Sequence, residues 1–381
     1  MNHTSTINFE SNVQEKPIHI LHVFATFNVG GTEVRTCNII NNLGSRFSHS
    51  IRILKSGTDS KQLLNEADTW KIINTTFPTN LFKAILSAKK EIHTLKPDLI
   101  ITYSWGAIEW VIANTLFNHI PLFHAEDGFT DETPANQKIL RLFIRRLFFR
   151  FSHKLVVPAI VLKKVAKKKW FVPENRIEYI PNSVDTNRFK PSTTREPHKK
   201  CILGIIGTLY AVKNHKRLFR VISQIPAELN LEVWIIGSGP DETSLITYGN
   251  ELSISNRLKF LGLRKDTESL LQKMDIFCLT SDHEQMPLTV LEAMACGLPI
   301  MSTDVGDVKT MVSEGNTPFI TPINKEERYL SKLLELISSE KLRLSIGTTN
   351  RKRCCELFST ATMYNHYRTL FELAFNRATK Y

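Results

Sequence analysis

Short apolar runs alternate with longer stretches of helical periodicity along most of the chain, and they form two blocks. The first block contains the runs 18–25, 51–54, 98–103, 121–124 and 154–157. The second block contains the runs 201–207, 231–237, 258–261, 275–279 and 299–302. Because this alternation is typical of parallel strands joined by crossover helices, the sequence predicts an α/β fold with two parallel sheets.

A polar segment without periodicity separates the two blocks. It covers 191–198 and contains two prolines, which is typical of a linker. We therefore predict an N-terminal domain over 1–190, a C-terminal domain over 199–358 and a final helix over 359–381 that packs back on the N-terminal domain. A ligand of such a pair is expected in the cleft at the carboxyl ends of the strands.

Most of the excess positive charge lies in one segment. The 381 residues include 49 Lys and Arg against 37 Asp and Glu, yet residues 138–169 hold eleven basic residues and no acidic one. These basic residues recur at helical spacing among Leu, Ile, Phe and Trp, which is the pattern of a basic amphipathic helix. The candidate surface residues are Arg141, Arg145, Arg146, Lys167 and Lys168.

The basic segment has three interpretations. It contacts an anionic membrane surface, it is an ordinary solvated helix face, or it binds nucleic acid. No nucleic-acid-binding motif accompanies the charge, so we favour the membrane surface and expect no nucleic-acid partner.

The sequence also bears on location and redox state. No stretch free of charged residues reaches the ~18 to 20 apolar residues of a bilayer-spanning helix, and the first twenty residues lack the pattern of a signal peptide. The six cysteines have no metal-ligand spacing and are interpreted as reduced, mostly buried thiols. We expect a cytoplasmic protein, peripheral at the inner face of the cytoplasmic membrane.

In each block, a glycine-containing turn follows the first apolar run. Gly30 and Gly31 come directly before a helical pattern, where backbone amides and the helix dipole favour an anion. In the second block, Gly207 begins a turn that places the ammonium group of Lys213 where it could meet a phosphate. Plain loop geometry and a solvated lysine are the alternatives.

The stretch 280–299 is the most informative part of the sequence. Pro287 suits the start of a helix and Gly297 its end, so Glu284 is expected in the preceding loop and Glu292 within the helix. Free amides at the helix start would then lie beside two carboxylate acceptors, which suits a hydroxylated and phosphorylated ligand. Two solvated glutamates are the alternative interpretation.

On these residues the sequence resembles the retaining glycosyltransferases of family 4, which have the GT-B fold of two facing Rossmann-like domains with an inter-domain cleft. The resemblance covers nearly the whole chain and rests on Gly30-Gly31, His124, 180–185, 207–213 and 284–292. The segments 124–129 and 302–307 are similar to enzymes of bacterial exopolysaccharide or lipopolysaccharide synthesis.

The resemblance implies transfer of a sugar from a nucleoside diphosphate sugar to a saccharide or lipid-linked acceptor, with retention at the anomeric carbon. The chain contains no Asp-x-Asp motif, so neither a metal nor another cofactor is expected. Glu284 would bind hydroxyls of the donor sugar together with the amides of Met286 and Leu288. Glu292 would bind the ribose hydroxyls.

The remaining implied roles concern the diphosphate and the anomeric centre. Lys213 and the Gly207 turn would bind the diphosphate, and Gly30 and Gly31 would bind the same phosphates from the opposite domain. His124 would contact the donor sugar near the anomeric carbon. Glu284, His124 and Lys213 are thus the catalytic candidates.

Two positions depart from the family pattern. Thr208 stands where the family commonly has Arg, and Lys216 or Arg217 is the only nearby substitute. The segment 306–310 lacks a common Gly-Gly-x-Pro-Glu sequence. These departures leave an alternative, a catalytically impaired GT-B protein that acts as a membrane-associated binding module.

Overall fold

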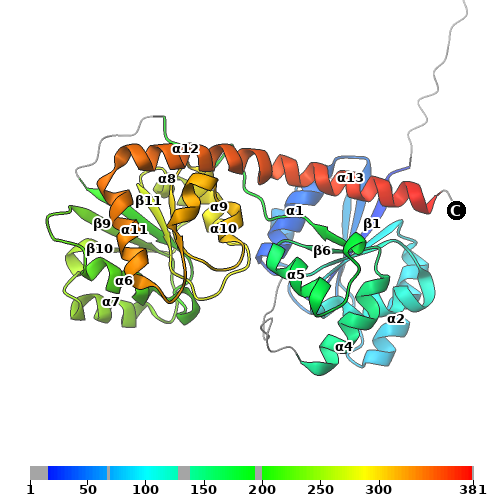
Figure 1. Ribbon diagram of the computed structural model, residues 1–381. Coiled ribbons are helices and arrows are strands. Elements are labelled where there is room, and N and C mark those ends of the chain that lie inside the picture. Colours follow the sequence, from blue (N-terminus) through cyan, green and yellow to red (C-terminus); the bar gives the residue numbers. More distant parts are fainter. Residues whose placement is uncertain (1–15, 67–68, 128–137, 194–199, 380–381) are drawn as a thin grey trace, which may run out of the picture. The chain divides into compact units, whose positions relative to one another are not determined.

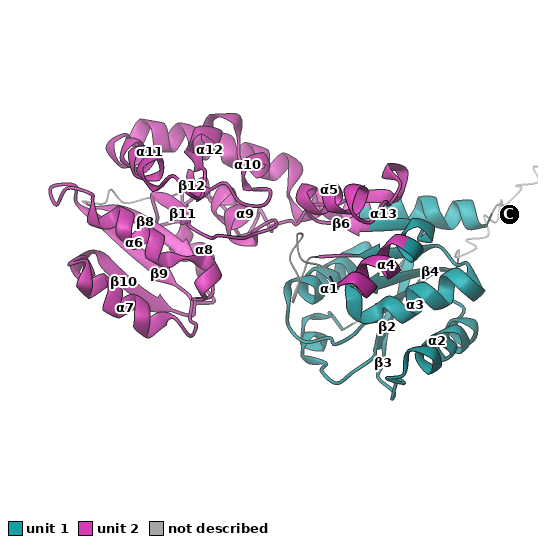
Figure 2. Ribbon diagram, turned by 60° about the horizontal axis from the view of Figure 1, so that its bottom comes forward, with its two compact units in different colours: residues 1–125, 147–155, 367–381 teal, residues 126–146, 156–366 magenta. Residues whose placement is uncertain are grey.

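A computed structural model describes residues 16–66, 69–127, 138–193 and 200–379 of the chain (Figure 1). The described residues divide into two compact units (Figure 2). Unit 1 comprises Met1–Ala125, Leu147–Leu155 and Tyr367–Tyr381, and unit 2 comprises Glu126–Arg146 and Val156–His366. Most of the expected linker, residues 194–198, and Gly128 and Phe129 of the 124–129 segment lie outside the described residues.

The described elements alternate between strands and helices in chain order. The strands are β1 Ile18–Phe24, β2 Phe47–Ile53, β3 Trp70–Ile73, β4 Leu99–Tyr103, β5 Leu122–Ala125, β6 Lys154–Val157, β7 Ile177–Tyr179, β8 Cys201–Ile206, β9 Leu231–Ile236, β10 Leu258–Gly262, β11 Ile276–Leu279, β12 Ile300–Thr303 and β13 Ile320–Thr321. The α-helices are α1 Gly31–Leu43, α2 Leu81–Leu95, α3 Ile108–Ala113, α4 Ile139–Phe148, α5 Ile160–Lys168, α6 His215–Ser223, α7 Glu242–Glu251, α8 Thr267–Leu271, α9 Leu288–Ala295, α10 Val308–Met311, α11 Glu326–Ser338, α12 Glu340–Leu357 and α13 Thr360–Ala378.

Two parallel sheets carry these elements, as the sequence predicted. The described strands of the first sheet follow the order β3-β2-β1-β4-β5-β6-β7, and those of the second follow β10-β9-β8-β11-β12-β13. In both sheets the chain first winds outward in one direction and then returns to the middle and winds in the other. Ligands of such sheets bind outside the carboxyl ends of the strands where the direction reverses, which is between β1 and β4 and between β8 and β11.

The apolar runs form the cores of the sheets. In the second sheet, side chains such as Leu203, Val233 and Ile276 pack with residues of the helices α6 and α11. In unit 1, the Phe371 ring of α13 packs edge-on against Phe47 and Phe123 at 6.3 and 5.4 Å between ring centroids. Among the described residues, no helix is both long and apolar enough to cross a bilayer.

A close contact between two glycines fixes the helix α9 in unit 2. Gly297, with a φ of +76°, ends α9, and a Cβ added at Gly347 of α12 would lie 1.9 Å from the Gly297 carbonyl oxygen. Beside this contact, Asn350 donates to the Leu298 carbonyl at 2.9 Å and Arg351 donates to the Ala295 carbonyl at 2.8 Å. Helix α12 therefore holds the carboxyl end of the helix that carries Glu292.

We expect Gly347→Ala to lower the free energy of unfolding by about 1 to 3 kcal/mol, because a methyl group has no space between α12 and the end of α9. Gly315→Ala is the matched control, since a Cβ there meets no atom within 4 Å. Chemical denaturation of both variants measures the difference. Equal stability of the two variants would contradict the close packing of α12 on α9.

Candidate functional site

Lys213 lies directly beyond the carboxyl end of β8. The chain passes from β8 through Gly207 into a short 3-10 helix, Ala211–Lys213, and then into α6. Asn214 makes this turn with a φ of +46°, and its side chain caps α6 by accepting from the Arg217 amide at 3.2 Å. A Cβ at Gly207 would lie 4.0 Å from the Cε atom of Lys213, so the backbone passes close beside this side chain.

Glu284 lies in the loop between β11 and α9, as the sequence predicted. Pro287 caps α9, which begins at Leu288, so Glu292 lies within the helix and Glu284 precedes it. The amides of Leu288 and Thr289 in its first turn have no acceptor inside the helix. This places amide donors and a carboxylate at the point where the second sheet reverses its direction.

Lys213 and Glu284 form an ion pair across this point. The Lys213 Nζ atom donates to the Glu284 Oε1 atom at 2.6 Å, and the Ser281 hydroxyl donates to the same oxygen at 2.8 Å. The two charged side chains are 27% and 11% exposed, so the pair is largely shielded from water but remains accessible. The pair thus places a cation next to a hydrogen-bond acceptor in the loop that precedes α9.

Glu292 lies within α9 and is half-buried. Burial raises the pKa of its carboxyl from 4.5 to about 7, while the charge of Arg188 opposes this shift and the charge of Glu268 adds to it. Arg188 is itself paired with Glu268 at 2.8 Å. Glu292 is therefore a half-ionised acceptor near neutral pH and suits a ligand that donates hydrogen bonds to it.

A buried arginine joins the two loops that carry the ion pair. Arg217 of α6 donates to the Thr280 carbonyl at 2.6 Å and to the Asp282 carboxylate at 2.8 Å. Thr280 in turn donates its hydroxyl to the Lys213 carbonyl at 3.2 Å. Arg217 thus connects the two loops. The ammonium group of Lys216 lies 5.3 Å over the Tyr248 ring. Both candidate substitutes for the arginine that is missing at Thr208 therefore contact other groups.

Three further residues hold the Glu284 loop, and the sequence analysis did not assign them this role. A Cβ at Gly306 would lie 2.7 Å from the Glu284 carbonyl, and the Asp307 amide donates to the Gln285 carbonyl at 2.7 Å. Asn182 donates to the Met286 carbonyl at 3.0 Å. In the sequence, the segments 180–185 and 306–310 were compared only with the family pattern, and no local signal predicted their contact with the Glu284 loop.

The candidates of unit 1 occupy a different setting. Gly30 caps α1, which begins at Gly31, at the carboxyl end of β1. His124 lies inside β5, not after it, and its side chain is completely buried, with its Nδ1 atom 2.8 Å from the Thr102 hydroxyl and its ring beside Phe149. The His124 side chain is closed off from solvent in the free chain, and its expected contact with the donor sugar stays a prediction.

The basic segment forms α4 and α5, and one of its residues corrects the sequence analysis. Arg145 was expected on an exposed face, but it is only 2% exposed, 3.7 Å from the Glu126 carboxylate and 5.1 Å from the Trp170 ring. Its charge is compensated inside the protein. Arg146 remains exposed beside Phe171, and Lys167 pairs with Glu174.

Comparison with known proteins gives matches along most of the chain. A family model described as Glycosyltransferase Family 4 matches residues 29–188, and one described as Glycosyl transferases group 1 matches residues 186–353. The chain belongs to glycosyltransferase family 4. The two matches meet at residues 186–188 and together include both carboxylates and Lys213.

Curated relatives are about a quarter identical to this glycosyltransferase over the aligned residues. An N-acetyl-alpha-D-glucosaminyl L-malate synthase of Bacillus anthracis is 26% identical over 170 residues, 45% of each chain. A UDP-Gal:alpha-D-GlcNAc-diphosphoundecaprenol alpha-1,3-galactosyltransferase of Escherichia coli is 27% identical over 281 residues, 69% of this chain and 72% of the relative. The match to the first relative thus spans less than half of that protein's length.

Solved structures share the fold of this glycosyltransferase. HepE of Anabaena, in complex with UDP, has a TM-score of 0.78 at 18% identity and covers 93% of this chain and 99% of its own. A sucrose-phosphate synthase from Thermosynechococcus elongatus has a TM-score of 0.76 at 16% identity and covers 94% and 99%. Together with the two parallel sheets, these matches establish the GT-B fold that the sequence predicted.

The raised pKa of Glu292 predicts a specific pH dependence of stability. The folded protein holds the proton up to about pH 7 and the unfolded chain only to about 4.5, so stability falls as pH rises through this range. We expect Glu292→Gln to match the parent near pH 4.5 and to exceed its stability by about 1 to 3 kcal/mol at pH 8. Denaturation curves at both pH values measure this difference in stability, and Glu327→Gln, at an exposed position, is the control. Parallel pH profiles of the parent and Glu292→Gln would contradict the raised pKa of Glu292.

Proposed function

We propose that this chain transfers a sugar from a nucleoside diphosphate sugar to a saccharide or lipid-linked acceptor in bacterial surface polysaccharide synthesis. The observation that carries the proposal is the Lys213–Glu284 ion pair at the start of α9. The printed activity of the Escherichia coli relative, a UDP-Gal transferase with a diphosphoundecaprenol acceptor, and the UDP in the HepE structure support this donor and acceptor class.

In the proposed reaction the ion pair exchanges its partners when the donor binds. Lys213 turns to the diphosphate, and Glu284 accepts hydrogen bonds from hydroxyls of the donor sugar, assisted by the amides of Met286 and Leu288. The exchange keeps the ammonium group paired, because the diphosphate replaces the carboxylate, and it leaves the carboxylate hydrogen-bonded to sugar hydroxyls. Donor binding thus changes the partners of Lys213 and Glu284, whereas the loops that hold these side chains are already in position.

Lys213 is proposed to act as the electrostatic catalyst. When the bond between the anomeric carbon and the diphosphate breaks, negative charge grows on the leaving oxygen, and a fixed ammonium group stabilises it. The first amides of α9 point their dipole in the same direction. We propose that the acceptor oxygen bonds to the anomeric carbon on the face from which the diphosphate leaves, which gives retention, and that the acceptor hydroxyl proton passes to a diphosphate oxygen. We propose that no metal is required, because Lys213 and α9 stabilise the leaving diphosphate.

Glu292 is proposed to bind the ribose hydroxyls of the donor. Hydroxyl groups that donate to its carboxylate favour the charged form, so nucleotide binding would lower its raised pKa and release a proton near pH 7. Calorimetry in two buffers of different ionisation enthalpy detects such a release. A nucleotide held only by Lys213 and the start of α9 would bind without this proton release, so the release tests the contact with Glu292.

The ion-pair proposal predicts different losses for its two members. Lys213→Ala is expected to lower kcat/KM by about 10² to 10³ and to weaken UDP binding, because it removes the charge that meets the diphosphate. Glu284→Gln is expected to retain UDP binding but to lose the tighter binding of UDP-sugars over UDP. Transfer assays and calorimetry measure both, and Lys273→Ala, an exposed lysine of the same unit, is the control.

Several outcomes would oppose this proposal. Full activity of Lys213→Ala, equal losses in the Lys273→Ala control, or loss of UDP binding in Glu284→Gln would each remove the assigned roles. Activity abolished by a chelator would overturn the metal-independent step, and an inverted anomeric signal in the proton NMR spectrum of the product would overturn retention.

We further propose that α4 attaches the enzyme to an anionic membrane surface, where a lipid-linked acceptor would lie. Large apolar side chains of α4 are exposed next to its basic residues: Leu140 is 69% and Phe143 61% exposed. Arg146 lies beside them, with its guanidinium 4.7 Å over the exposed Phe171 ring. An exposed apolar face bordered by Lys and Arg favours insertion at the headgroup level of a bilayer.

The double variant Leu140→Ser/Phe143→Ser is expected to weaken binding to phosphatidylglycerol vesicles by about tenfold, because it removes the inserted apolar area. Phe82→Ser is the control, since Phe82 is 70% exposed on α2 and does not belong to the basic segment. Cosedimentation measures binding, with phosphatidylcholine vesicles as the neutral reference. Unchanged sedimentation of the double variant would rule out α4 as the membrane contact.

A further inference from the structure

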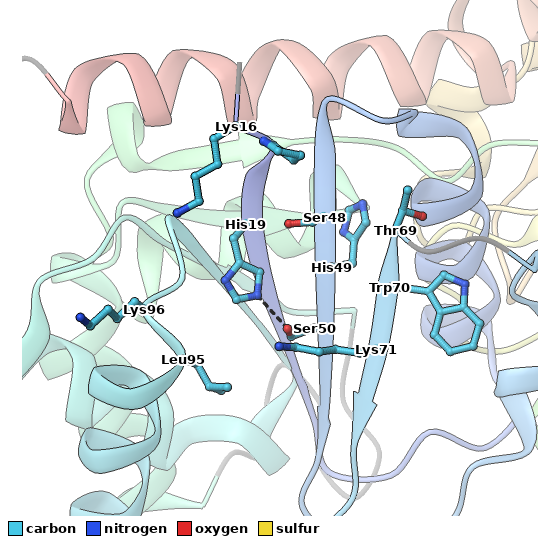
Figure 3. A pocket seen from close by; sticks show the side chains of 11 residues that line it. Lys16, His19, Ser48, His49, Ser50, Thr69, Trp70, Lys71, Leu95 and Lys96 are labelled. Atoms are coloured by element: carbon cyan, nitrogen blue, oxygen red, sulfur yellow. Dashed lines mark hydrogen bonds between the residues drawn. The ribbon is translucent and has the colours of Figure 1, made fainter. Parts of the chain in front are cut away.

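Unit 1 contains a second candidate site at the opposite end of its sheet from Gly30. A cavity of about 400 Å³ opens at the amino ends of β1, β2 and β3, next to the end of α2 (Figure 3). Gly30 follows the carboxyl end of β1, and the seven residues of this strand span about 20 Å. The cavity is therefore separate from the phosphate-binding turn expected at Gly30 and Gly31.

Lysines from three separate segments line this cavity. Lys16 precedes β1, Lys71 lies on β3, and Lys96 follows α2. Within the described residues, none of the three ammonium groups has an ion-pair partner. A carboxylate of the described residues also lies close by: Asp98 accepts the His19 amide at 2.7 Å.

Two of these lysines, Lys71 and Lys16, act on the His19 imidazole that lines the cavity. The pKa of His19 is lowered, first by burial and then by the charge of Lys71, with a smaller contribution from Lys16, while Asp98 opposes the shift. Exposed lysines that face only solvent have no such common target. Lys71 and Lys16 therefore act on one region of the cavity, and an anion that binds between them relieves their mutual repulsion.

Polar groups suited to an oxyanion line the wall between the lysines. The His19 Nε2 atom lies 2.7 Å from the Ser50 hydroxyl, and Ser48 is on the same face of the sheet because parallel partners in register point to the same side. His49 also borders the cavity, but its side chain lies on the opposite face of the sheet from Ser48 and Ser50, because successive strand residues alternate between faces, and it contacts His22 at 3.0 Å. Burial lowers the pKa of His49 to about 3, so this imidazole is neutral and the charge of the cavity comes from the lysines.

We infer that this cavity binds a phosphate group, held by Lys16, Lys71 and Lys96 with hydroxyl and imidazole donors from the sheet. A phosphate offers several acceptor oxygens and up to two negative charges, which matches several donors and three unpaired ammonium groups. The group is carried either by a free phosphorylated molecule or by a lipid headgroup. It is an additional ligand site of the enzyme, independent of the donor site in unit 2.

The test uses inorganic phosphate and the full chain with Lys213→Ala, so that the proposed donor site does not contribute. The added double change Lys71→Ala/Lys96→Ala is expected to weaken phosphate binding by about tenfold or more, because two charge-assisted contacts are lost. Lys83→Ala/Lys90→Ala, two exposed lysines of α2, is the matched control. Titration calorimetry at constant ionic strength measures binding.

Binding that is unchanged in Lys71→Ala/Lys96→Ala, or reduced equally in the control, would overturn the inference, as would an absence of phosphate binding in the Lys213→Ala parent. A parallel experiment with phosphatidylglycerol vesicles identifies the source. Reduced sedimentation of Lys71→Ala/Lys96→Ala assigns the site to a lipid headgroup, and unchanged sedimentation with reduced phosphate binding assigns it to a free phosphorylated molecule. Neither result depends on the donor proposed for unit 2.

Discussion

The ion pair between Lys213 and Glu284 is the interaction on which the account of this glycosyltransferase depends. It forms where the second sheet reverses its winding direction, so the fold itself brings the loop after β8 to the loop after β11. Neither loop relies on this pair alone. Arg217 ties them together through Thr280 and Asp282, and the cation and the acceptor are therefore placed before any ligand arrives.

Rigid support surrounds the residues that are proposed to meet the donor. Glycine contacts hold the carboxyl end of α9 against α12, and Gly306 lies against the backbone of the Glu284 loop. Glu292, in contrast, is kept in a state that is costly for the free enzyme, because burial opposes its negative charge. A ligand that supplies hydrogen bonds to this carboxylate relieves the cost, which links the stability of the fold to occupation of the site.

Much of this arrangement could be predicted from the sequence, and the failures have physical causes. The apolar runs gave both parallel sheets, and the Pro287 and Gly297 signals placed Glu284 and Glu292 relative to α9. The pattern missed the first half of β2 because two of its buried residues, His49 and Ser50, are polar. Histidines of β1 contact both: His22 lies 3.0 Å from His49, and His19 lies 2.7 Å from Ser50. Arg145 was misplaced for the same reason, since a partner distant in sequence compensates its charge.

The most direct measurement is the distance between the Lys213 Nζ and Glu284 Oε1 atoms in a structure of the chain bound to UDP. In the free chain these atoms are 2.6 Å apart. The account predicts that they separate beyond about 4 Å, and that Nζ lies about 3 Å from a diphosphate oxygen. A bound nucleotide with the ion pair still closed and its phosphates held by other residues would contradict the central claim.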